Sequence, residues 1–430
     1  MGAVLALAGA PAVASELFDL SLEELAAMPV TSVFRRAEAV SAAPASIYVI
    51  SADDIRRSGA ATLAEALRLA PNLQVARVDA RGYAISARGF NNAIGNKLLV
   101  MVDGRTVYSP LFSGVFWDQQ DAMLEDVERI EVVSGPGATQ WGANAVNGVI
   151  NVITRNARDT RGALVAGTAG RTEDGAVARV GTALAGGDLR LYGKSIDHAG
   201  TRRADGTPVG DAWRRWQAGF RADWSGPVHA FTLVGEAYDG EAKAGTVLGT
   251  PSFSGASLLG RWTRSAADGS ELRVQAYVDQ AERDDVVLFR DRMRVHDLEA
   301  QYLTTLGGHQ VMVGAGYRYA RDRTERTPLV VFMPAERDLR WSNLFVQDTV
   351  QLAPDWRVAV GVKLERNVYT GLELLPSLRL AWTKSPRELV WGAVLRAVRA
   401  PARLDREFFL PGSPPFAING GPDFESEVVN

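Results

Sequence analysis

From about residue 160 onward, polar and apolar residues alternate along the chain in runs of roughly ten residues. Runs at 271–280, 309–321 and 356–365 show the pattern clearly. In the last of these, one face would carry Trp356, Val358, Val360, Val362 and Leu364, and the opposite face Arg357, Ala359, Gly361, Lys363 and Glu365. A period of two is typical of β-strands, whose successive side chains point to opposite faces. The pattern therefore predicts a large β-sheet.

Two environments would produce this alternation. Strands of about ten residues suit a tilted crossing of a bilayer, and membrane barrels carry aromatic girdles near their strand ends. The aromatic residues placed to form such girdles are Trp213, Trp216, Trp224, Trp262, Trp341, Trp356, Trp382, Trp391, Tyr317 and Tyr319. A soluble β architecture that packs its apolar face inward is the alternative. No run reaches the ~18 apolar residues of a membrane-spanning helix, so a membrane protein of this sequence would be a barrel.

Three polar stretches are predicted to be long loops, at 198–211, 239–255 and 321–338. Membrane barrels join their strands by short turns on one side and by longer loops on the other. Because binding residues concentrate in loops, a ligand site is expected on the long-loop side. Solvated connectors without a specific role are the alternative.

Residues 41–155 show a different pattern, which indicates a compact α/β unit. Ser51 and Asp54 form a capping-box pattern at the start of a helix, and Thr62 and Glu65 repeat it. Short apolar runs predict strands at 73–78, 84–90, 97–104, 127–133 and 148–154.

Composition argues against several classes of function. The net charge is −3, from 47 basic and 50 acidic residues, so nothing suggests a nucleic-acid-binding polycation. The chain has no cysteine, which excludes disulfides, thiolate metal sites and a cysteine nucleophile. The four histidines, His198, His229, His296 and His309, show no metal-ligand spacing. With no catalytic constellation recognisable, we predict neither an enzyme nor a resident metal or cofactor.

The glycine-rich stretch VVSGPGATQWGANAVNGVINVIT (132–154) could be read as a phosphate-binding loop. The spacing of Gly135, Gly137 and Gly142 lacks both the dinucleotide fingerprint and the phosphate-loop lysine. We therefore expect these glycines to permit tight turns and close backbone approach. Trp141 is interpreted as a packing residue.

The N-terminus, MGAVLALAGAPAVAS, is small and apolar and ends in Ala-Val-Ala before Ser15. That pattern predicts a signal peptide at 1–14, incomplete because it lacks a basic start. A frayed apolar N-terminus is the alternative. Residues 15–40 are expected to form an extension ahead of the α/β unit.

The motifs of residues 29–154, taken together and in this order, resemble the plug domain of TonB-dependent outer-membrane receptors. The matching segments are PVTSV (29–33), SIYVISADDIRRSGAATLAEALRLAPNLQV (46–75), ISARGFN (85–91), LLVMVDGRTVY (98–108) and VERIEVVSGPGATQWGANAVNGVINVIT (127–154). Further on, RAVRAPARLDREFF (396–409) resembles the family's mid-barrel Arg-Ala-Pro segment, and PDFESE (422–427) follows it.

The resemblance implies a 22-stranded antiparallel membrane β-barrel with the N-terminal α/β plug domain, 41–155, inside its lumen. Residues 156–430 are too few for that barrel and end at Asn430 without a terminal aromatic residue. We therefore expect a partial barrel from a fragment or truncated product, although an open barrel leaves costly unpaired strand edges in lipid. A smaller complete barrel is the alternative, but its lumen would be too narrow for the plug.

The resemblance also implies a function. Such receptors lie in the bacterial outer membrane and import a scarce, bulky ligand into the periplasm, using the proton-motive force relayed by TonB. A ferric siderophore or other iron complex is the expected ligand. Cobalamin, haem or another nutrient, or a non-transporting binding or signalling role, are alternatives. The implied partners are TonB with its ExbB and ExbD motor partners, outer-membrane lipid and the metal-chelate or cofactor ligand, with no nucleic acid.

Three sets of residues would perform this function. The predicted TonB box is Pro29, Val30, Thr31, Ser32 and Val33, an extended pentamer that could add a strand to the sheet edge of TonB; a plain linker is the alternative. The predicted ligand-binding residues, which could instead pack the plug against the wall, are Tyr83, Phe90, Asn91, Asn92, Tyr108, Phe112, Phe116 and Trp117. The predicted contacts between plug and barrel are Arg88, Asp103, Arg129 and Glu131. Ser134 departs from the family pattern, which has an arginine there.

Overall fold

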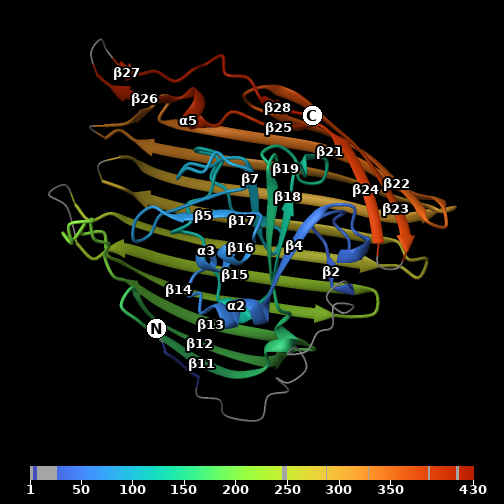
Figure 1. Cartoon of the computed structure of the whole chain (residues 1–430), viewed down its shortest axis with the longest axis horizontal. Helices are drawn as coiled ribbons and strands as arrows, with labels where there is room; N and C mark the ends of the chain where they lie inside the picture. The colour runs from blue at the N-terminus through green and yellow to red at the C-terminus, as the bar shows by residue number, and fades with distance from the viewer. Residues whose placement is uncertain are drawn as a thin grey trace.

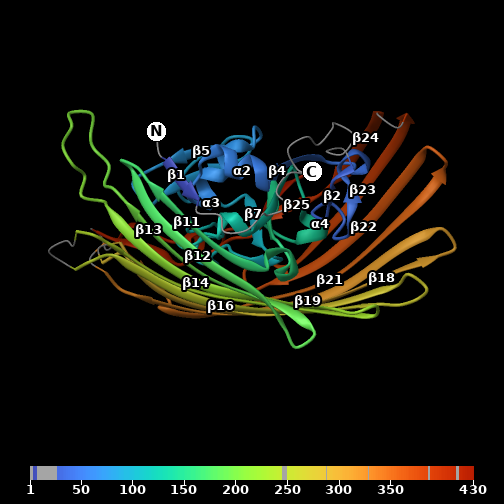
Figure 2. The ribbon, with the colours of Figure 1, turned by 90° about the horizontal axis from the view of Figure 1, so that it is seen from below.

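The computed structural model describes residues 3–6, 27–244, 249–286, 288–327, 329–385, 388–412 and 416–430. A large curved sheet forms a trough, and a compact α/β domain, the plug, lies in its concave side (Figure 1, Figure 2). Among the described residues, no helix is both long and apolar enough to cross a membrane.

The plug is built around a five-stranded sheet in the order β4-β9-β10-β7-β8. Its strands are β4 (Ser46–Ser51), β9 (Val127–Ser134), β10 (Gly148–Thr154), β7 (Leu98–Val102) and β8 (Arg105–Thr106). Only the β10–β7 pairing is parallel. Two hairpin-like pairs join β5 (Gln74–Arg77) to β6 (Tyr83–Ser86), and β2 (Pro29–Val30) to β3 (Glu38–Ala39). Strands β5, β6, β7, β9 and β10 lie within a few residues of the five runs predicted from the sequence.

Short helices complete the plug. They are α2 (Ala52–Ser58), α3 (Leu63–Ala66) and α4 (Ala138–Trp141), with 3-10 turns η1 (Val40–Ala42), η2 (Leu67–Leu69), η3 (Leu124–Asp126) and η4 (Ala157–Thr160). The predicted capping box of Ser51 and Asp54 is present at α2. At α3 only half of the predicted box forms, because Thr62 accepts from the Glu65 amide while the Glu65 carboxylate accepts from Arg68 and Tyr83.

The trough is a 14-stranded sheet in the described part of the chain. Apart from β1 (Ala3–Ala6), its strands follow one another along the chain and pair antiparallel; we call them the wall. They are β11 (Gly162–Ala169), β12 (Glu173–Leu184), β13 (Gly187–His198), β14 (Trp213–Ser225), β15 (His229–Ala242), β16 (Ser252–Ser265), β17 (Glu271–Asp284), β18 (Arg290–Leu306), β19 (His309–Glu325), β21 (Glu336–Ala353), β22 (Trp356–Asn367), β23 (Gly371–Ser385) and β24 (Glu388–Leu395). No pairing among the described residues joins β24 to the β1 or β11 edge, so the wall is an open barrel.

β1 pairs with β11 at one edge of the wall. The rest of the predicted signal peptide (1–14) lies outside the described residues, as do residues 15–26 of the predicted extension. The signal peptide, and the prediction that the chain is a fragment, stay predictions.

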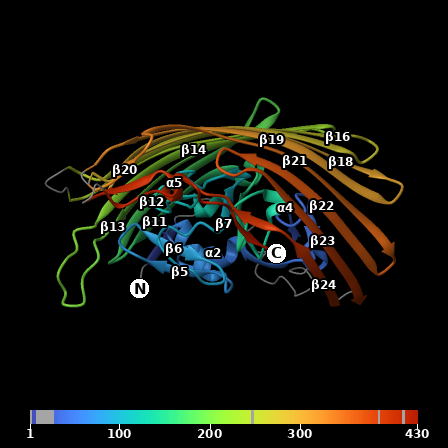
Figure 3. The same cartoon turned by 90° about the horizontal axis from the view of Figure 1, so that it is seen from above.

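After β24 the chain turns inward and lies across the plug. It forms β25 (Ala397–Arg399), α5 (Arg403–Arg406), β26 (Phe408–Pro411), β27 (Phe416–Ile418) and β28 (Glu427–Val429), and β26 also pairs with β20 (Val331–Phe332). Ala397 and Val398 pack against Ala143 and Val146 of the plug. Figure 3 shows α5 lying across the plug.

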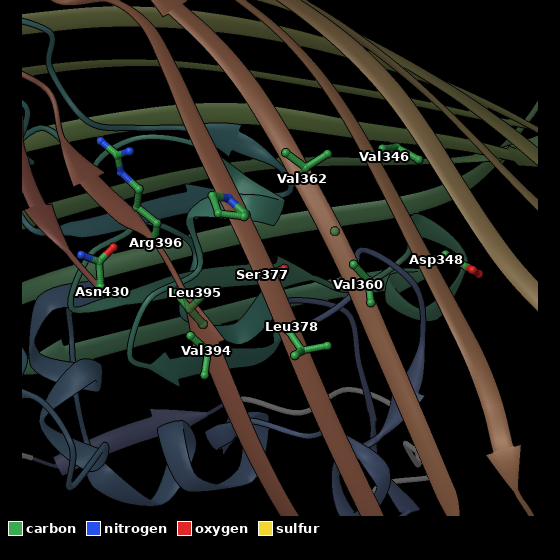
Figure 4. Close-up of a pocket in the computed structure, with 12 residues that line it drawn as sticks. Val346, Asp348, Val360, Val362, Ser377, Leu378, Val394, Leu395, Arg396 and Asn430 are labelled. Atoms are coloured by element: carbon green, nitrogen blue, oxygen red, sulfur yellow. The ribbon is translucent and has the colours of Figure 1, made fainter.

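The structure settles which face of the wall is apolar. On β22 the polar residues Lys363 and Glu365 point into the trough and are buried against the plug, whereas Val360 and Leu364 point outward and are exposed. A hollow of about 910 Å³ on the outer side of β21–β24 is lined by outward-facing Val346, Val360, Leu378 and other side chains (Figure 4). An apolar exterior around a polar interior is the pattern of a membrane barrel, so the soluble alternative is wrong.

The aromatic girdle is only partly as predicted. Trp216 is 59% exposed on the outer face, and the rings of Trp356 and Trp382 stack there with centroids 5.6 Å apart. Trp213, Trp341 and Trp391 instead lie on the inward face, and Trp213 is 4% exposed and stacked on His198. Composition identified the residue type, but strand register decides the face.

The longest connections between wall strands all lie at the same end of the wall. Short turns such as 185–186, 307–308 and 354–355 lie at one end, and the longer connections 199–212 and 326–335 lie at the other. The loops predicted at 239–255 and 321–338 are shorter than expected, because β15, β16, β19 and β21 extend into them. Apart from Ala242 and Phe253, the strand residues there are polar or glycine on both faces, so the alternation is lost.

We predict that Val360→Arg destabilises the folded wall, because it places a charge on the hydrocarbon-facing side at mid-strand. The expected loss is about 2–4 kcal/mol of unfolding free energy, measured by urea titration in phosphatidylcholine vesicles. Val209→Arg, on the exposed loop 199–212, is the control and should change little. Equal effects of the two variants would contradict the assigned orientation.

Candidate functional site

Glu131, at the centre of plug strand β9, is fully buried and anchors the predicted TonB box. The backbone amides of Thr31 and Ser32 donate to its carboxylate at 3.0 and 2.8 Å, and the Ser32 hydroxyl donates at 2.5 Å. Arg129 Nε donates to the same carboxylate at 2.9 Å. These donors offset the high cost of burying a carboxylate.

Other plug residues also bind the segment 29–33. Trp141 Nε1 donates to the Ser32 carbonyl at 2.8 Å, and Asn151 Nδ2 donates to the Ser32 hydroxyl at 3.2 Å. Val30 and Val33 are buried, with 1% and 4% of their surface exposed. Trp141 is thus more than the packing residue that its sequence context indicated. Binding of residues 29–33 to TonB stays a prediction.

The chain just after this segment is tied to the wall. The Arg35 guanidinium lies 4.3 Å from the Trp141 ring centroid and pairs with Glu299 on β18. Glu38 pairs with Arg357 on β22, next to the short turn 354–355. The segment 29–38 therefore lies toward the short-turn end of the wall.

At the long-loop end, two buried carboxylates of the plug are bound by wall cations. Asp118 accepts from both terminal nitrogens of Arg283, at 2.9 and 2.8 Å. Asp121 accepts from Lys194 Nζ at 2.6 Å and lies 3.4 Å from Arg215. Burial alone would raise the pKa of each aspartate, but the facing cations, with hydrogen bonds, hold both pKa values below the ordinary range.

Of the four predicted plug–barrel charges, Asp103 touches the wall. Its carboxylate lies 3.6 Å from Arg221 Nη1, and its carbonyl accepts from Arg261. Arg129 and Glu131 pair with each other inside the plug. Arg88 is exposed, and no ion pair involving it is found in the described part of the chain. At the position where the family has arginine, Ser134 Oγ accepts from Asn72.

Sequence reasoning missed most of the wall contacts. Arg105 on β8 binds Asp279 at 2.5 Å and also Glu236, and Asp126 pairs with Arg179 and Arg190. The alternation along each wall strand, which shows which residues face the lumen, is the only sequence signal that could have indicated these contacts. Their partners are separated by 53 to 174 residues, so spacing along the chain carries no signal.

Most of the predicted ligand-binding residues are covered. Phe112 and Phe116 belong to an apolar cluster with Val330 and Phe332 of the connection between β19 and β21. Tyr108 accepts from Arg318 at 3.1 Å, and Trp117 packs against the plug core. Their ligand role stays a prediction, which requires the covering segments to move.

Tyr83 is 6% exposed and donates to Glu65 at 2.7 Å. Burial, with the hydrogen bond to Glu65, raises the pKa of the Tyr83 phenol, so it remains a neutral donor at neutral pH. A ligand role for Tyr83 also stays a prediction.

The loop that includes Phe90, Asn91 and Asn92 is different, because it is open to solvent. Phe90 is 78% exposed. The backbone φ angles of Arg88, Gly89 and Phe90 are all positive, at 60°, 93° and 56°. Left-handed backbone at non-glycine residues is strained and concentrates at functional sites. An exposed arginine and an exposed ring are therefore presented together on a strained loop.

The glycine-rich stretch serves close packing. A Cβ on Gly142, whose φ is +91°, would lie 2.2 Å from Glu365 Oε2 of the wall. A Cβ on Gly148 would lie 2.4 Å from the Val133 carbonyl. The expectation of close backbone approach is confirmed. Among the described residues, no group of three or more His, Asp or Glu is arranged to hold a metal ion.

An antiparallel wall with an apolar exterior, tied by inward charges to an α/β plug, defines a plugged outer-membrane barrel. The family model described as "TonB-dependent Receptor Plug Domain" matches residues 39–149. The family model described as "TonB dependent receptor-like, beta-barrel" matches residues 149–430. The chain belongs to the TonB-dependent receptor family, whose members lie in the outer membrane of Gram-negative bacteria.

Several characterised proteins are similar in sequence. The vitamin B12 transporter BtuB of Vibrio vulnificus is 35% identical over 128 residues, 29% of this chain and 20% of that protein. The ferric enterobactin receptor PirA of Pseudomonas aeruginosa is 31% identical over 172 residues, 35% of this chain and 23% of that protein. The chain thus matches less than a quarter of the length of these two relatives.

Solved structures share the fold. The siderophore receptor PirA from Pseudomonas aeruginosa superposes with a TM-score of 0.68 at 19% identity, over 89% of this chain and 70% of that one. The alcaligin outer-membrane receptor FauA from Bordetella pertussis superposes with a TM-score of 0.71 at 14% identity, over 90% of this chain and 69% of that one.

We predict that Glu131→Ala releases residues 29–33 from the plug, because it removes the acceptor of their amide hydrogen bonds. A hydrogen bond to a charged group contributes about 1.5–3 kcal/mol. A spin label at position 31, introduced as a single cysteine, should become more mobile. Glu128→Ala, on the same strand but half-exposed, is the control. If the spin-label spectrum were unchanged in Glu131→Ala, the binding of residues 29–33 to Glu131 would be contradicted.

The pKa values of Asp118 and Asp121 are lowered by folding, so their stabilisation is present above the unfolded value near 4 and is lost as pH falls through the folded value. We expect Asp118→Asn to lower the thermal unfolding midpoint by the same amount from about pH 8 to 5 and by less below about pH 4. A loss that already shrinks between pH 7 and 5 would contradict this.

Proposed function

We propose that this protein is a receptor that binds a scarce, bulky ligand at its long-loop end and imports it into the periplasm when TonB pulls on residues 29–33. The observation that supports the proposal is that residues 29–38 and the plug's contact with a long loop lie at opposite ends of the plug. Residues 29–38 lie toward the short turns, where Glu38 meets Arg357. At the other end, the Ala80 amide donates to Asp211 of loop 199–212.

The contacts support a pulling mechanism. Residues 29–33 are bound by hydrogen bonds to Glu131, Trp141 and Asn151, and no disulfide crosses from plug to wall, since the chain has no cysteine. Force applied at residue 29 would first break these bonds and then the Arg35–Glu299 pair. Nothing in this sequence of steps requires an enzyme.

A ferric siderophore or other iron complex is the ligand that we propose. Arg88 and Phe90 offer a cation and an aromatic face to solvent, which suits an anionic chelate with flat rings. Similarity to receptors named for ferric enterobactin supports the same class. Cobalamin is the second candidate, because other relatives are named vitamin B12 transporters.

The test is uptake of labelled ferric siderophores, haem and cobalamin by cells that express the protein, with and without TonB. We expect uptake of an iron complex that disappears without TonB. Uptake that persists without TonB would sink the mechanism. Binding without any uptake would point instead to a non-transporting receptor.

We predict that Arg88→Gln weakens binding of an anionic iron complex by about tenfold to a hundredfold, the range of one charged hydrogen bond. Arg158→Gln removes an exposed arginine at the short-turn end and should leave the affinity unchanged. Equilibrium titration of the purified receptor checks both variants. If Arg88→Gln bound the iron complex as tightly as the unchanged protein, Arg88 would not belong to the ligand site.

A further inference from the structure

Lys363, on wall strand β22, is a buried cation without a bonded partner. Its surface is 2% exposed, and among the described residues its ammonium makes no hydrogen bond or ion pair. Lys194, another lysine that faces the lumen, binds Asp121 at 2.6 Å. An unpaired charge inside a protein is costly. The stability of the resting structure therefore gives no reason for a lysine at position 363.

Two cations lie against one aromatic ring, that of Phe345 on β21. The Lys363 ammonium lies 5.5 Å from the ring centroid, and the Arg35 guanidinium lies 4.9 Å from it. The two charged groups are thus within about 10 Å of each other and repel. Only Arg35 has an anion, because it pairs with Glu299 on β18.

Arg35, Glu299 and Lys363 line the same cavity, which has a volume of about 70 Å³ and lies between plug and wall. Glu365, two residues along β22, lines it as well. Both Glu365 and Glu299 attract the Lys363 ammonium, although it touches neither. A polar cavity of this size has room for water. The ammonium can therefore stay charged there and has space in which to move.

The wall leaves room between Glu299 and the ring on which Lys363 lies. On β19, the strand next to Glu299, the residues opposite Glu299 and Phe345 are Gly316 and Gly314. A Cβ on Gly314 would lie 2.3 Å from the Phe345 ring. No β19 side chain therefore stands between Glu299 and the ring.

Glu299 loses its partner if residues 29–38 are pulled away, because Arg35 leaves with them. Removing one partner of an ion pair in the lumen leaves an uncompensated charge. The Glu299 side chain is 27% exposed, so water would screen that charge only in part.

We propose that Lys363 is a positioning residue that replaces Arg35 as the counter-ion of Glu299 during import. When Arg35 leaves, its repulsion ends, and the ammonium moves past the Phe345 ring to Glu299. When Arg35 returns, the ammonium moves back. One cation then stays beside Glu299 throughout, which lowers the cost of releasing residues 29–38. This inference rests on the proposed function, in which that segment leaves the plug.

The crystal structure of the full chain carrying Arg35→Gln tests the exchange directly, because this variant represents the state without Arg35. We expect Lys363 Nζ within about 4 Å of the Glu299 carboxylate, the distance of an ion pair. In Arg35→Gln/Glu299→Gln the ammonium should stay beside Phe345. An ammonium that has not moved in Arg35→Gln would overturn the proposal.

A double-mutant cycle measures the exchange in solution, by urea titration of the protein in phosphatidylcholine vesicles. Lys363→Met alone should reduce the folding equilibrium constant by less than about threefold, whereas in the Arg35→Gln background it should reduce it about tenfold more. Lys194→Met is the matched control. Because Lys194 is already bound to Asp121, its loss should have the same effect in both backgrounds.

Repulsion between Arg35 and Lys363 would by itself couple the two substitutions, but that coupling would survive Glu299→Gln. We expect most of the coupling to disappear in the Glu299→Gln background. Coupling that Glu299→Gln leaves unchanged, or an equal effect of Lys363→Met with and without Arg35, would overturn the proposal. If Arg35→Gln/Lys363→Met does not fold, the crystal structure of Arg35→Gln decides. Neither measurement involves TonB or ligand, so a failure here is distinguishable from a failure of import.

Discussion

The structure depends on a wall whose inner face is charged. Charged side chains placed inside a lumen are costly unless they are paired. The plug supplies those pairs, with Arg105 between Asp279 and Glu236, Asp118 on Arg283, and Asp121 on Lys194. The ion pairs that offset the cost of the charged inner face therefore also hold the plug inside the wall.

This form of attachment suits a plug that moves, as the proposed function requires. An apolar interface resists separation over its whole area, whereas ion pairs in a polar lumen can exchange their partners for water one at a time. The dock of residues 29–33 on Glu131 has the same character, because every contact there is a hydrogen bond except the burial of Val30 and Val33. The ion pairs and hydrogen bonds that hold the plug are strong when no force acts, and they can break and re-form when force is applied in one direction.

Local features were predictable from the sequence and long-range ones were not. Five plug strands (β5, β6, β7, β9 and β10) and the Ser51 cap depend on neighbouring residues, so the pattern located them well. The inward positions of Trp213 and Trp341 depend on register, and composition could not supply it. Glu131 was expected to face the wall, but its neighbours along the chain give no sign of Thr31 and Ser32, about 100 residues away. Phe112 and Phe116 were chosen as exposed aromatics, and a segment some 200 residues later covers them.

The central claim is that residues 29–33 must leave the plug before import can occur. Ser32 and Asn151 are in side-chain contact at 3.2 Å, and the chain has no cysteine of its own, so Ser32→Cys/Asn151→Cys can lock the segment with one disulfide. The decisive measurement is TonB-dependent uptake by this variant before and after reduction. We predict that ligand binding is unchanged, that uptake is absent in the oxidised form, and that reduction restores it. Undiminished uptake with the disulfide intact would contradict the account.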